Sequence, residues 1–310
     1  MNALPSFRTG TPRLEQGYVQ PLPGIDIPFT VIEGTQPGPV LLVTAGVHAS
    51  EFCSIEAAIR LQQTKPESLK GTLVILPILN MQGFRKRSIY IMPEDGKNLN
   101  RQFPGKPDGT LSEQLAFWLS DTVFPQADAY LDLHGGDLDE SLLPFTIYPR
   151  GDAGSKALAT AFGIKIAIAS DGKTNSINGA VQHGIPSLLP EMSGNGLWDN
   201  ALVGELTDGI ARVMLHLGMI DGPVKPAPQV TPDFVTMWVP TAPMDGLWYS
   251  AKQIAETVET GEVLGEIRDV FGVVLATIRS EKAGIVVYRM TSLSVNQGEA
   301  LLGIGSPLVE

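Results

Sequence analysis

Apolar and polar positions alternate in blocks along the chain from about residue 25 to residue 220. Several blocks are continuous apolar runs, which predict strands that are covered on both faces of a sheet. Between them, apolar residues recur at intervals of three and four, which predicts helices with one buried side. Strands and helices that alternate in this way predict an α/β domain.

The pattern places the expected elements as follows. Strands are expected at residues 40–45, 73–79, 129–133, 145–148, 164–169 and 186–189. Helices are expected at residues 50–62, 111–124 and 197–217. The segment from residue 80 to residue 109 lacks clear periodicity and is rich in glycine, proline and charge. Segments of that length without regular structure are usually functional loops.

The pattern changes after residue 220. Residues 221–232 contain four prolines and predict a linker or domain edge. From there to Glu310 the chain has short β-like runs and many glycines, with one stretch at 251–259 that is ambiguous between helix and strand. We therefore expect two domains, an α/β domain over residues 1–222 and an all-β domain over residues 223–310.

Composition and charge narrow the class of protein. The chain has 310 residues, of which 43% are hydrophobic and 18% charged, as is typical of soluble globular proteins. A net charge of −11 argues against nucleic acid as a partner, because phosphates are bound by clustered lysine and arginine. The basic run at residues 85–87 is too short for such a surface. An acidic protein that binds an anion must gather arginines locally, so arginines near the motifs matter.

The N-terminal residues and the single cysteine indicate in which cellular compartment the protein is expected. Residues 1–17 carry prolines and charges where a signal peptide would need an apolar run. No stretch approaches the roughly 18 apolar residues of a membrane span. Cys53 alone excludes an intramolecular disulfide framework and fits a reducing compartment. We expect a soluble cytoplasmic protein without membrane contact, in which Cys53 is either a buried packing residue or, less expectedly, a catalytic thiol.

Three side chains form a candidate metal-ligand set. His48 and Glu51 lie in GVHASEF, just past an expected strand, and a spacing of three at a helix start brings both to one side. His134 ends another expected strand, in LDLHGG. Two imidazoles and a carboxylate are the ligands of a zinc hydrolase whose fourth position is open. Taken singly, HxxE is often an incidental polar pair, and a histidine like His134 is more often structural. Asp132 could orient an imidazole or cap its strand.

Further polar residues could supply the chemistry around such a metal. Glu191, in LLPEMSG, follows an apolar run and is either a solvated loop residue or a general base. Asn100 and Arg101, in NLNRQFPG, could bind a carboxylate, since the arginine fork makes two parallel bonds, although a solvated loop pair is the ordinary interpretation. Arg85 or, preferably, Arg87 could face the developing oxyanion. His183 and His216 look structural.

Together these motifs resemble a known family. The order of GVHxxE, DGxxLNRxFPG, LDLHGG and GIPxxxxE resembles the succinylglutamate desuccinylase/aspartoacylase family within the zinc carboxypeptidase-like superfamily. It is most similar to bacterial N-acetyl-diamino-acid deacetylases of ectoine breakdown. The resemblance covers about residues 25–220. It implies a zinc-carboxypeptidase-like mixed sheet flanked by helices, with a C-terminal all-β domain similar to a barrel-sandwich hybrid.

The resemblance also implies roles for individual residues. His48, Glu51 and His134 would hold one zinc ion, and Glu191 would act as general base and then acid. Asn100 and Arg101 would bind the free α-carboxylate, and Arg87 would stabilise the oxyanion. Two departures stand out: Ala49 occupies a position where many members have glycine, and the family's oxyanion arginine often lies closer to the Asn-Arg pair than Arg87 does.

The C-terminal residues resemble the paired hairpins of biotinyl and lipoyl carrier domains, in which a lysine lies at the tip of a turn. The corresponding tip here is near residues 268–272, which contain no lysine, and Lys282 lies beyond it. We therefore expect no carrier function. The β domain would pack over the cleft or mediate contacts in a homo-oligomer.

The sequence thus predicts a zinc-dependent hydrolase that cleaves the amide bond of a small anionic N-acyl amino acid. A zinc carboxypeptidase acting on peptides shares every motif and stays an alternative. A non-catalytic metal-binding module is a further alternative. A nucleotide enzyme is disfavoured, because no GxGxxG or GxxxxGK motif occurs at a strand-to-helix turn.

Overall fold

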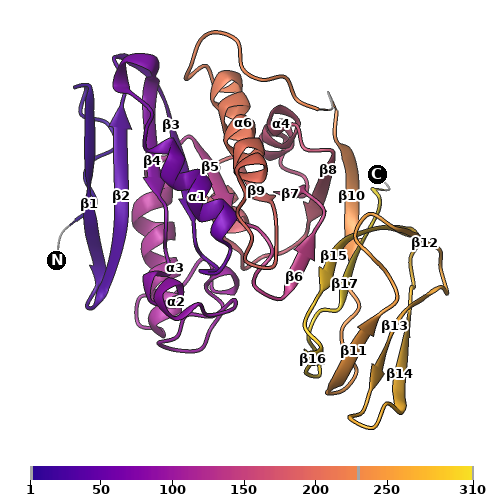
Figure 1. Ribbon diagram of the computed structural model, residues 1–310. Coiled ribbons are helices and arrows are strands. Elements are labelled where there is room, and N and C mark those ends of the chain that lie inside the picture. Colours follow the sequence, from indigo (N-terminus) through magenta and orange to yellow (C-terminus); the bar gives the residue numbers. More distant parts are fainter. Residues whose placement is uncertain (1–2, 229–230, 309–310) are drawn as a thin grey trace.

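A long mixed β-sheet runs through most of the molecule (Figure 1), and the candidate metal ligands and Glu191 lie at or just after the ends of its strands. The computed structural model describes residues 3–228 and 231–308. Thirteen strands form this sheet, in the order β1-β2-β4-β3-β5-β9-β7-β8-β10-β17-β15-β12, with β6 paired to β15. A smaller antiparallel sheet has the order β14-β13-β11-β16.

The bounds of the elements are these. The strands of the first 222 residues are β1 (Arg13–Leu22), β2 (Ile25–Glu33), β3 (Gln36–Ala45), β4 (Lys70–Leu76), β5 (Ala129–Leu133), β6 (Glu140–Leu142), β7 (Phe145–Pro149), β8 (Ile166–Ser170) and β9 (Ser187–Glu191). The later strands are β10 (Asp233–Trp238), β11 (Gly246–Ser250), β12 (Thr257–Val258), β13 (Val263–Arg268), β14 (Val274–Arg279), β15 (Gly284–Met290), β16 (Ser294–Val295) and β17 (Leu302–Pro307). The α-helices are α1 (Phe52–Leu61), α2 (Met81–Lys86), α3 (Leu111–Trp118), α4 (Ala153–Phe162), α5 (Ser176–Val181) and α6 (Asn200–His216).

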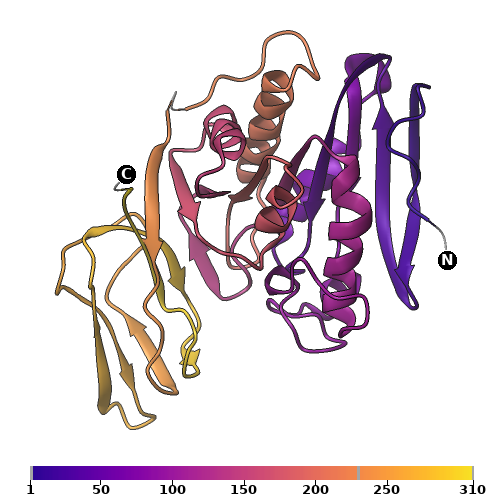
Figure 2. The ribbon, with the colours of Figure 1, turned by 180° about the vertical axis from the view of Figure 1, so that it is seen from behind.

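The central strands are parallel, and they bury both faces of the sheet. Strand β3 pairs in parallel with β4 and β5, and β5 pairs in parallel with β9. Helices α1, α4 and α6 pack on one face, whereas α3 and α5 pack on the other (Figures 1 and 2). This double cover explains the continuous apolar runs in the sequence, because neither face of these strands meets water. The carboxyl ends of β3, β5 and β9 meet at one edge of the sheet.

The predicted fold class is confirmed: a mixed sheet flanked by helices carries a C-terminal antiparallel β region. The six expected strands and three expected helices are present, with ends displaced by a few residues. Several elements were missed, namely the N-terminal hairpin β1–β2, helices α2, α4 and α5, and the short strand β6. The ambiguous stretch at residues 251–259 is not helical; it is irregular apart from β12. The segment 80–109, expected to be a loop, is mostly irregular. It contains the short helix α2 and a 3₁₀ turn at Leu99–Arg101.

The C-terminal region continues the main sheet. After the proline-rich segment, β10 pairs in parallel with β8 and antiparallel with β17. Beyond it, the four-stranded sheet packs on a separate apolar core that includes Trp248 and Ile267. The expected domain boundary at residue 222 lies between α6 and β10. The main sheet continues across this boundary, because β10 pairs with β8. Within the described ranges, no helix is long and apolar enough to cross a membrane.

Candidate active site

The candidate metal ligands lie where parallel strands end. His48 and Glu51 follow β3, in the turn that leads into α1, and His134 directly follows β5. Glu191 is the last residue of β9, and a β-bridge pairs it with His134. Sites in open α/β sheets form at such carboxyl ends, because the chain leaves several neighbouring strands there at once. The sheet topology thus brings together residues that lie 143 positions apart between His48 and Glu191.

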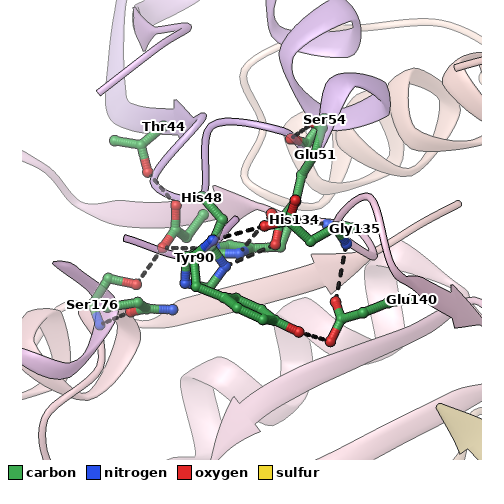
Figure 3. Close-up of polar contacts among 12 residues, drawn as sticks. Thr44, His48, Glu51, Ser54, Tyr90, His134, Gly135, Glu140 and Ser176 are labelled. Atoms are coloured by element: carbon green, nitrogen blue, oxygen red, sulfur yellow. Dashed lines mark hydrogen bonds and ion pairs between the residues drawn. The ribbon is translucent and has the colours of Figure 1, made fainter. Parts of the chain in front are cut away.

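The trio of His48, Glu51 and His134 has the geometry of a ligand set. His48 Nδ1 lies 2.7 Å from Glu51 Oε1, and His134 Nδ1 lies 2.9 Å from Glu51 Oε2. One ligand atom from each residue lies within 4.8 Å of the others, and all three side chains are buried. The close-up shows both imidazoles turned towards the Glu51 carboxylate (Figure 3). These residues could hold a metal ion, and a nitrogen, nitrogen and oxygen set suits zinc.

The outer nitrogen of each imidazole is bonded to the protein. His48 Nε2 donates to Asn98 Oδ1 at 3.1 Å, and His134 Nε2 donates to Asp132 Oδ2 at 3.1 Å. When an imidazole is neutral with its proton on Nε2, its Nδ1, on the Glu51 side, is free to bind a metal ion. Such outer partners fix the tautomer and orientation of metal-binding histidines. Metal binding through the two Nδ1 atoms would therefore leave both Nε2 hydrogen bonds in place.

Electrostatics within the trio favour a cation at its centre. Burial alone would raise the pKa of Glu51, but the positive charge of His134 and His48 outweighs it and lowers that pKa to about 2. Burial likewise opposes a charge on His134, yet Glu51 and Asp132 raise the pKa of that imidazole well above its ordinary value. The carboxylates therefore attract positive charge to the trio, which is the condition that a bound metal ion would meet.

Asp132 is held in place by three donors, which makes it a fixed partner for His134. Thr44 Oγ1 donates to Asp132 Oδ1 at 2.6 Å, and Ser176 Oγ donates to Oδ2, which also accepts from His134. Asp132 is completely buried. Of the two interpretations that the sequence left open for Asp132, the contacts match the orienting carboxylate.

Gly135 allows the chain after His134 to pass close to β9. A Cβ atom at Gly135 would lie 2.2 Å from the Met192 carbonyl oxygen, so a side chain cannot fit there. The amide N–H of Gly135 donates to Glu51 Oε2 at 3.2 Å. The glycine thus keeps the His134 strand end against both the ligand carboxylate and the strand that carries Glu191.

Glu191 faces the trio from the end of β9. Its Oε2 is buried without a hydrogen-bond partner among the described residues. Burial raises the pKa of the Glu191 carboxyl well above its usual value, and the nearby negative charge of Glu51 raises it further. A buried carboxyl with an unbonded oxygen is costly for stability, and such groups are found where a ligand, a water or a reaction uses them.

The two residues of the Asn100–Arg101 pair point to different places. Asn100 is buried, and its Oδ1 accepts from the backbone N–H of Ser176 at 2.8 Å, which ties the 3₁₀ turn to the start of α5. Arg101 lines the cleft and interacts electrostatically with Glu191. The contacts of Asn100 are those of a positioning residue, whereas Arg101 is the one arginine, with no lysine beside it, among the residues that line the described cleft.

Arg87 does not reach the cleft. It ends α2 in a left-handed conformation with φ of 55°, its side chain is exposed, and it is absent from the cleft lining. Arg85 lines a different, small cavity beside Ile25 and Asp26. The expected oxyanion role of Arg87 therefore has no support from the geometry, because the short helix α2 turns the basic run outwards. Tyr90, three residues later, takes the place beside the site.

Cys53 and the other two histidines lie outside the site. Cys53 is buried on α1, and burial, with some effect of Asp199, raises the pKa of its thiol to about 12. A thiol in that state is a packing residue and not a nucleophile. His183 contacts the Phe124 ring, and His216 is the last residue of α6.

The C-terminal region forms part of the wall of the cleft above the trio. It has a volume of about 710 Å³ and contains His48, Glu51, Arg101 and Glu191 on one side. Its opposite wall comes from the later strands and loops, through Met237, Val239, Tyr288, Met290, Glu299 and Ala300. The C-terminal region therefore packs at the cleft, which is one of the two arrangements expected from the sequence.

Sequence reasoning missed three residues at the site: Asn98, Tyr90 and Glu140. Asn98 is the first residue of NLNR and bonds to His48, so the motif itself contained that information. Tyr90 packs edge-on against His48 and donates a hydrogen bond to Glu140. Glu140 is buried in the same cleft. Nothing in the local pattern distinguishes Tyr90 or Glu140 from ordinary loop residues, because only the fold brings them to the trio.

With the geometry established, comparisons with known proteins place the chain in a family. A family model of the succinylglutamate desuccinylase/aspartoacylase catalytic domain matches residues 37–217. The chain therefore belongs to the succinylglutamate desuccinylase/aspartoacylase family, and the resemblance seen in the motifs is confirmed. Members of this family and its relatives are deacylases of N-acyl amino acids, which makes a hydrolase the class of enzyme that these findings support.

Individual relatives agree with this assignment. The chain is 29% identical over 293 residues to the N-alpha-acetyl-L-2,4-diaminobutyric acid deacetylase of Halomonas elongata, with 89% of this chain and 84% of the relative covered. The product-bound ectoine utilization protein EutE (DoeB) from Ruegeria pomeroyi is similar in structure, with a TM-score of 0.82, 26% identity and coverage of 91% and 89%. A succinylglutamate desuccinylase/aspartoacylase from Rhodobacter sphaeroides has a TM-score of 0.81, 29% identity and coverage of 92% and 90%.

Proposed function

We propose that this protein is a zinc-dependent hydrolase that cleaves the amide bond of a small N-acyl amino acid. The observation that carries the proposal is the arrangement of His48, Glu51 and His134 in one cleft with the unbonded carboxyl oxygen of Glu191. The lone, buried Cys53 is consistent with a reducing compartment, so we place the enzyme in the cytoplasm.

The metal would be held by the two Nδ1 atoms and the Glu51 carboxylate. When bound, zinc polarises the acyl carbonyl and lowers the pKa of water towards about 7. The donor set fits this ion because both rings have their Nε2 proton held by Asn98 or Asp132. The proposal of zinc in place of another divalent ion depends on the nitrogen-rich set.

Glu191 would move the proton. Its raised pKa suits a group that accepts a proton from the attacking water and passes it to the departing amine. The neighbouring Arg101 guanidinium favours the ionised form that starts this sequence. One carboxyl can serve both steps because it faces the trio from the adjacent strand end.

Arg101 would bind the carboxylate of the substrate. It is the one arginine of the described cleft lining, and its planar fork can make two parallel bonds to a carboxylate. Asn100 would keep the 3₁₀ turn in position through Ser176. A carboxylate bound at Arg101 fixes the distance from Arg101 to the scissile amide. The substrate is thereby aligned with the metal site and Glu191.

The wall that the C-terminal region adds to the cleft favours a small substrate over a peptide. Six residues of the C-terminal region form its far wall, which leaves less room for a long peptide than an open groove would. This disfavours the carboxypeptidase alternative. The metal-binding module without catalysis is disfavoured by Glu191, since its buried, unpartnered Oε2 would only destabilise such a module.

Amine release from a panel of N-acyl amino acids tests this function. The panel begins with Nα-acetyl-L-2,4-diaminobutyric acid, the substrate in the name of the Halomonas elongata relative, and includes N-succinyl and N-acetyl derivatives of glutamate and aspartate. Matched compounds lack the α-carboxylate, and dipeptides and tripeptides complete the set. We expect turnover of one N-acyl amino acid and little of its decarboxylated analogue. Faster cleavage of tripeptides than of every N-acyl amino acid would establish the carboxypeptidase instead.

A further inference from the structure

Tyr90 lies beside the candidate metal centre in a strained backbone conformation. Its φ is 58°, in the left-handed region that residues other than glycine rarely adopt. Such conformations persist only where the surroundings hold them, and they cluster at functional sites. Tyr90 also lines the cleft, between the loop after α2 and the metal trio.

Two hydrogen bonds hold Tyr90 in this conformation. Its backbone N–H donates to Asp137 Oδ2 at 2.9 Å, and its hydroxyl donates to Glu140 Oε1. Glu140 is 6% exposed, and its other oxygen accepts from the Asp137 N–H at 2.9 Å. Both acceptors belong to the segment that follows His134, so Tyr90 links the loop after α2 to the loop after β5.

The Tyr90 ring contacts His48 directly. The two ring centroids are 5.3 Å apart, and the planes meet at 89°, an edge-on contact (Figure 3). Asn98 already holds the Nε2 of the same imidazole. His48 is therefore restrained from two sides, by the hydrogen bond between its Nε2 and Asn98 and by the edge-on contact with the Tyr90 ring.

We propose that Tyr90 is a positioning residue for the metal ligand His48 and that Glu140 is the anchor of Tyr90. This inference rests on the metal centre proposed above. Glu140 starts β6, which pairs with β15 of the C-terminal region, so the anchor is itself fixed by the sheet. The function of this contact is to keep the imidazole in the orientation that binds the metal. Removing the partners of metal-binding histidines weakens metal affinity by about 10–100-fold.

Zinc affinity of the metal-free protein tests the inference directly. It is measured by competition with a chromophoric chelator for the wild type, Tyr90→Phe, Glu140→Ala, Glu140→Gln and the double variant Tyr90→Phe/Glu140→Ala. Tyr18→Phe is the matched control, since Tyr18 is 58% exposed on β1. The visible spectrum of the cobalt-substituted protein reports ligand geometry independently of activity. Circular dichroism and thermal melting establish that each variant is folded.

We expect Tyr90→Phe to weaken zinc binding about tenfold and to change the cobalt spectrum. Glu140→Gln should stay within about threefold of the wild type, because its amide can accept from Asp137 and donate to the Tyr90 oxygen. The double variant should be no weaker than the weaker single variant, because both changes break one contact. Should Tyr90→Phe not fold, Glu140→Ala alone tests the anchor by the same two measurements.

Other outcomes would overturn the inference. Wild-type zinc affinity and an unchanged cobalt spectrum in Tyr90→Phe would show that Tyr90 has only a structural role. Losses that add in the double variant would show that Glu140 does not act through Tyr90. A wild type that binds no zinc would overturn the proposed metal centre as well, and this result is distinct from equal binding by wild type and variant.

Discussion

Each imidazole at the site has one nitrogen bonded to the protein and the other turned towards Glu51. That division is visible in the bonds of Asn98 and Asp132. Burial opposes a charge on His134, but the Glu51 and Asp132 carboxylates on its two sides raise the pKa of that imidazole. The cluster of candidate ligands could be predicted from the sequence, because two histidines and a glutamate follow expected strands within motifs that resemble a known family. Asp132 could be proposed as a partner from its place two residues before His134, whereas Tyr90 and Glu140 could not, since only the fold brings them to the trio.

Replacement of Glu191 tests the proton transfer. Glu191→Gln keeps the shape of the side chain but cannot accept the proton, so kcat should fall by at least about 10². Zinc content should not change, because Glu191 is not part of the trio. Steady-state kinetics and metal analysis of the same preparation measure both. Glu67→Gln, at an exposed position remote from the cleft, is the control. A kcat equal to that of the wild type would remove Glu191 from the mechanism.

Replacement of Cys53 tests the thiol alternative. The buried thiol, with its pKa raised to about 12, cannot act as a nucleophile near neutral pH. We expect Cys53→Ala to keep kcat within about twofold of the wild type. It should lower the free energy of unfolding by about 1 kcal/mol, since it leaves a small gap in the core. A kcat reduced a hundredfold in a folded, zinc-loaded variant would contradict this.

At the scale of elements, the pattern of apolar positions predicted the buried parallel strands well. It predicted the edge strand and the short helices poorly. Strands β3, β5 and β9 are apolar on both faces and stand out in the sequence. Strand β1 alternates exposed and half-buried residues, and it forms the outer edge of the sheet, so it carries a weaker pattern. The short helices α2 and α5, of six residues each, offer too few turns for periodicity to be seen.

The end of β2 anchors the N-terminal segment through Glu33. Its carboxylate accepts from the Thr9 hydroxyl and from the backbone N–H groups of Thr9 and Gly10, at 2.6, 2.7 and 2.7 Å. Burial tends to raise the pKa of Glu33, but these hydrogen bonds and Arg13 outweigh it and lower that pKa below its usual value. The folded state thus releases this proton more readily than the unfolded state does.

The stability that Glu33 contributes should therefore depend on pH. It is present above the unfolded-state pKa, about 4.3, and is lost as the pH falls through the lower folded-state pKa. At pH 7 we expect Glu33→Gln to lower the free energy of unfolding by about 1–3 kcal/mol. The difference should shrink at pH 3.5. Urea unfolding at pH 7, 5 and 3.5 measures it, with Glu67→Gln as control. A difference that grows towards low pH would contradict the assignment.

At the scale of the whole molecule, the C-terminal region completes both the sheet and the cleft. Strand β10 covers the edge of β8, and Val235 and Val287 pack with Phe145, Ile166 and Ile168. The sequence predicted a second, β-rich unit after the proline-rich segment. That its first strand joins the main sheet could not be predicted, because pairing between β8 and β10 depends on contacts 67 residues apart.

Removal of residues 223–310 should therefore destabilise the remainder. Burial of Val235 and Val287 contributes about 3–6 kcal/mol, and their loss leaves the β8 edge open. We expect residues 1–222 to melt at least about 10 °C below the full chain or to aggregate. Calorimetry of the two proteins at equal concentration measures this. A cooperative transition at the temperature of the full chain would show that the first 222 residues fold independently.

The most direct test of the central claim is removal and return of the metal. The best substrate of the N-acyl amino acid panel is assayed before chelation, after chelation and after zinc is added back, with zinc content measured each time. The account predicts that activity disappears with the metal and returns as about one zinc ion binds per chain at His48, Glu51 and His134. Undiminished turnover by folded protein shown to contain no metal would contradict it.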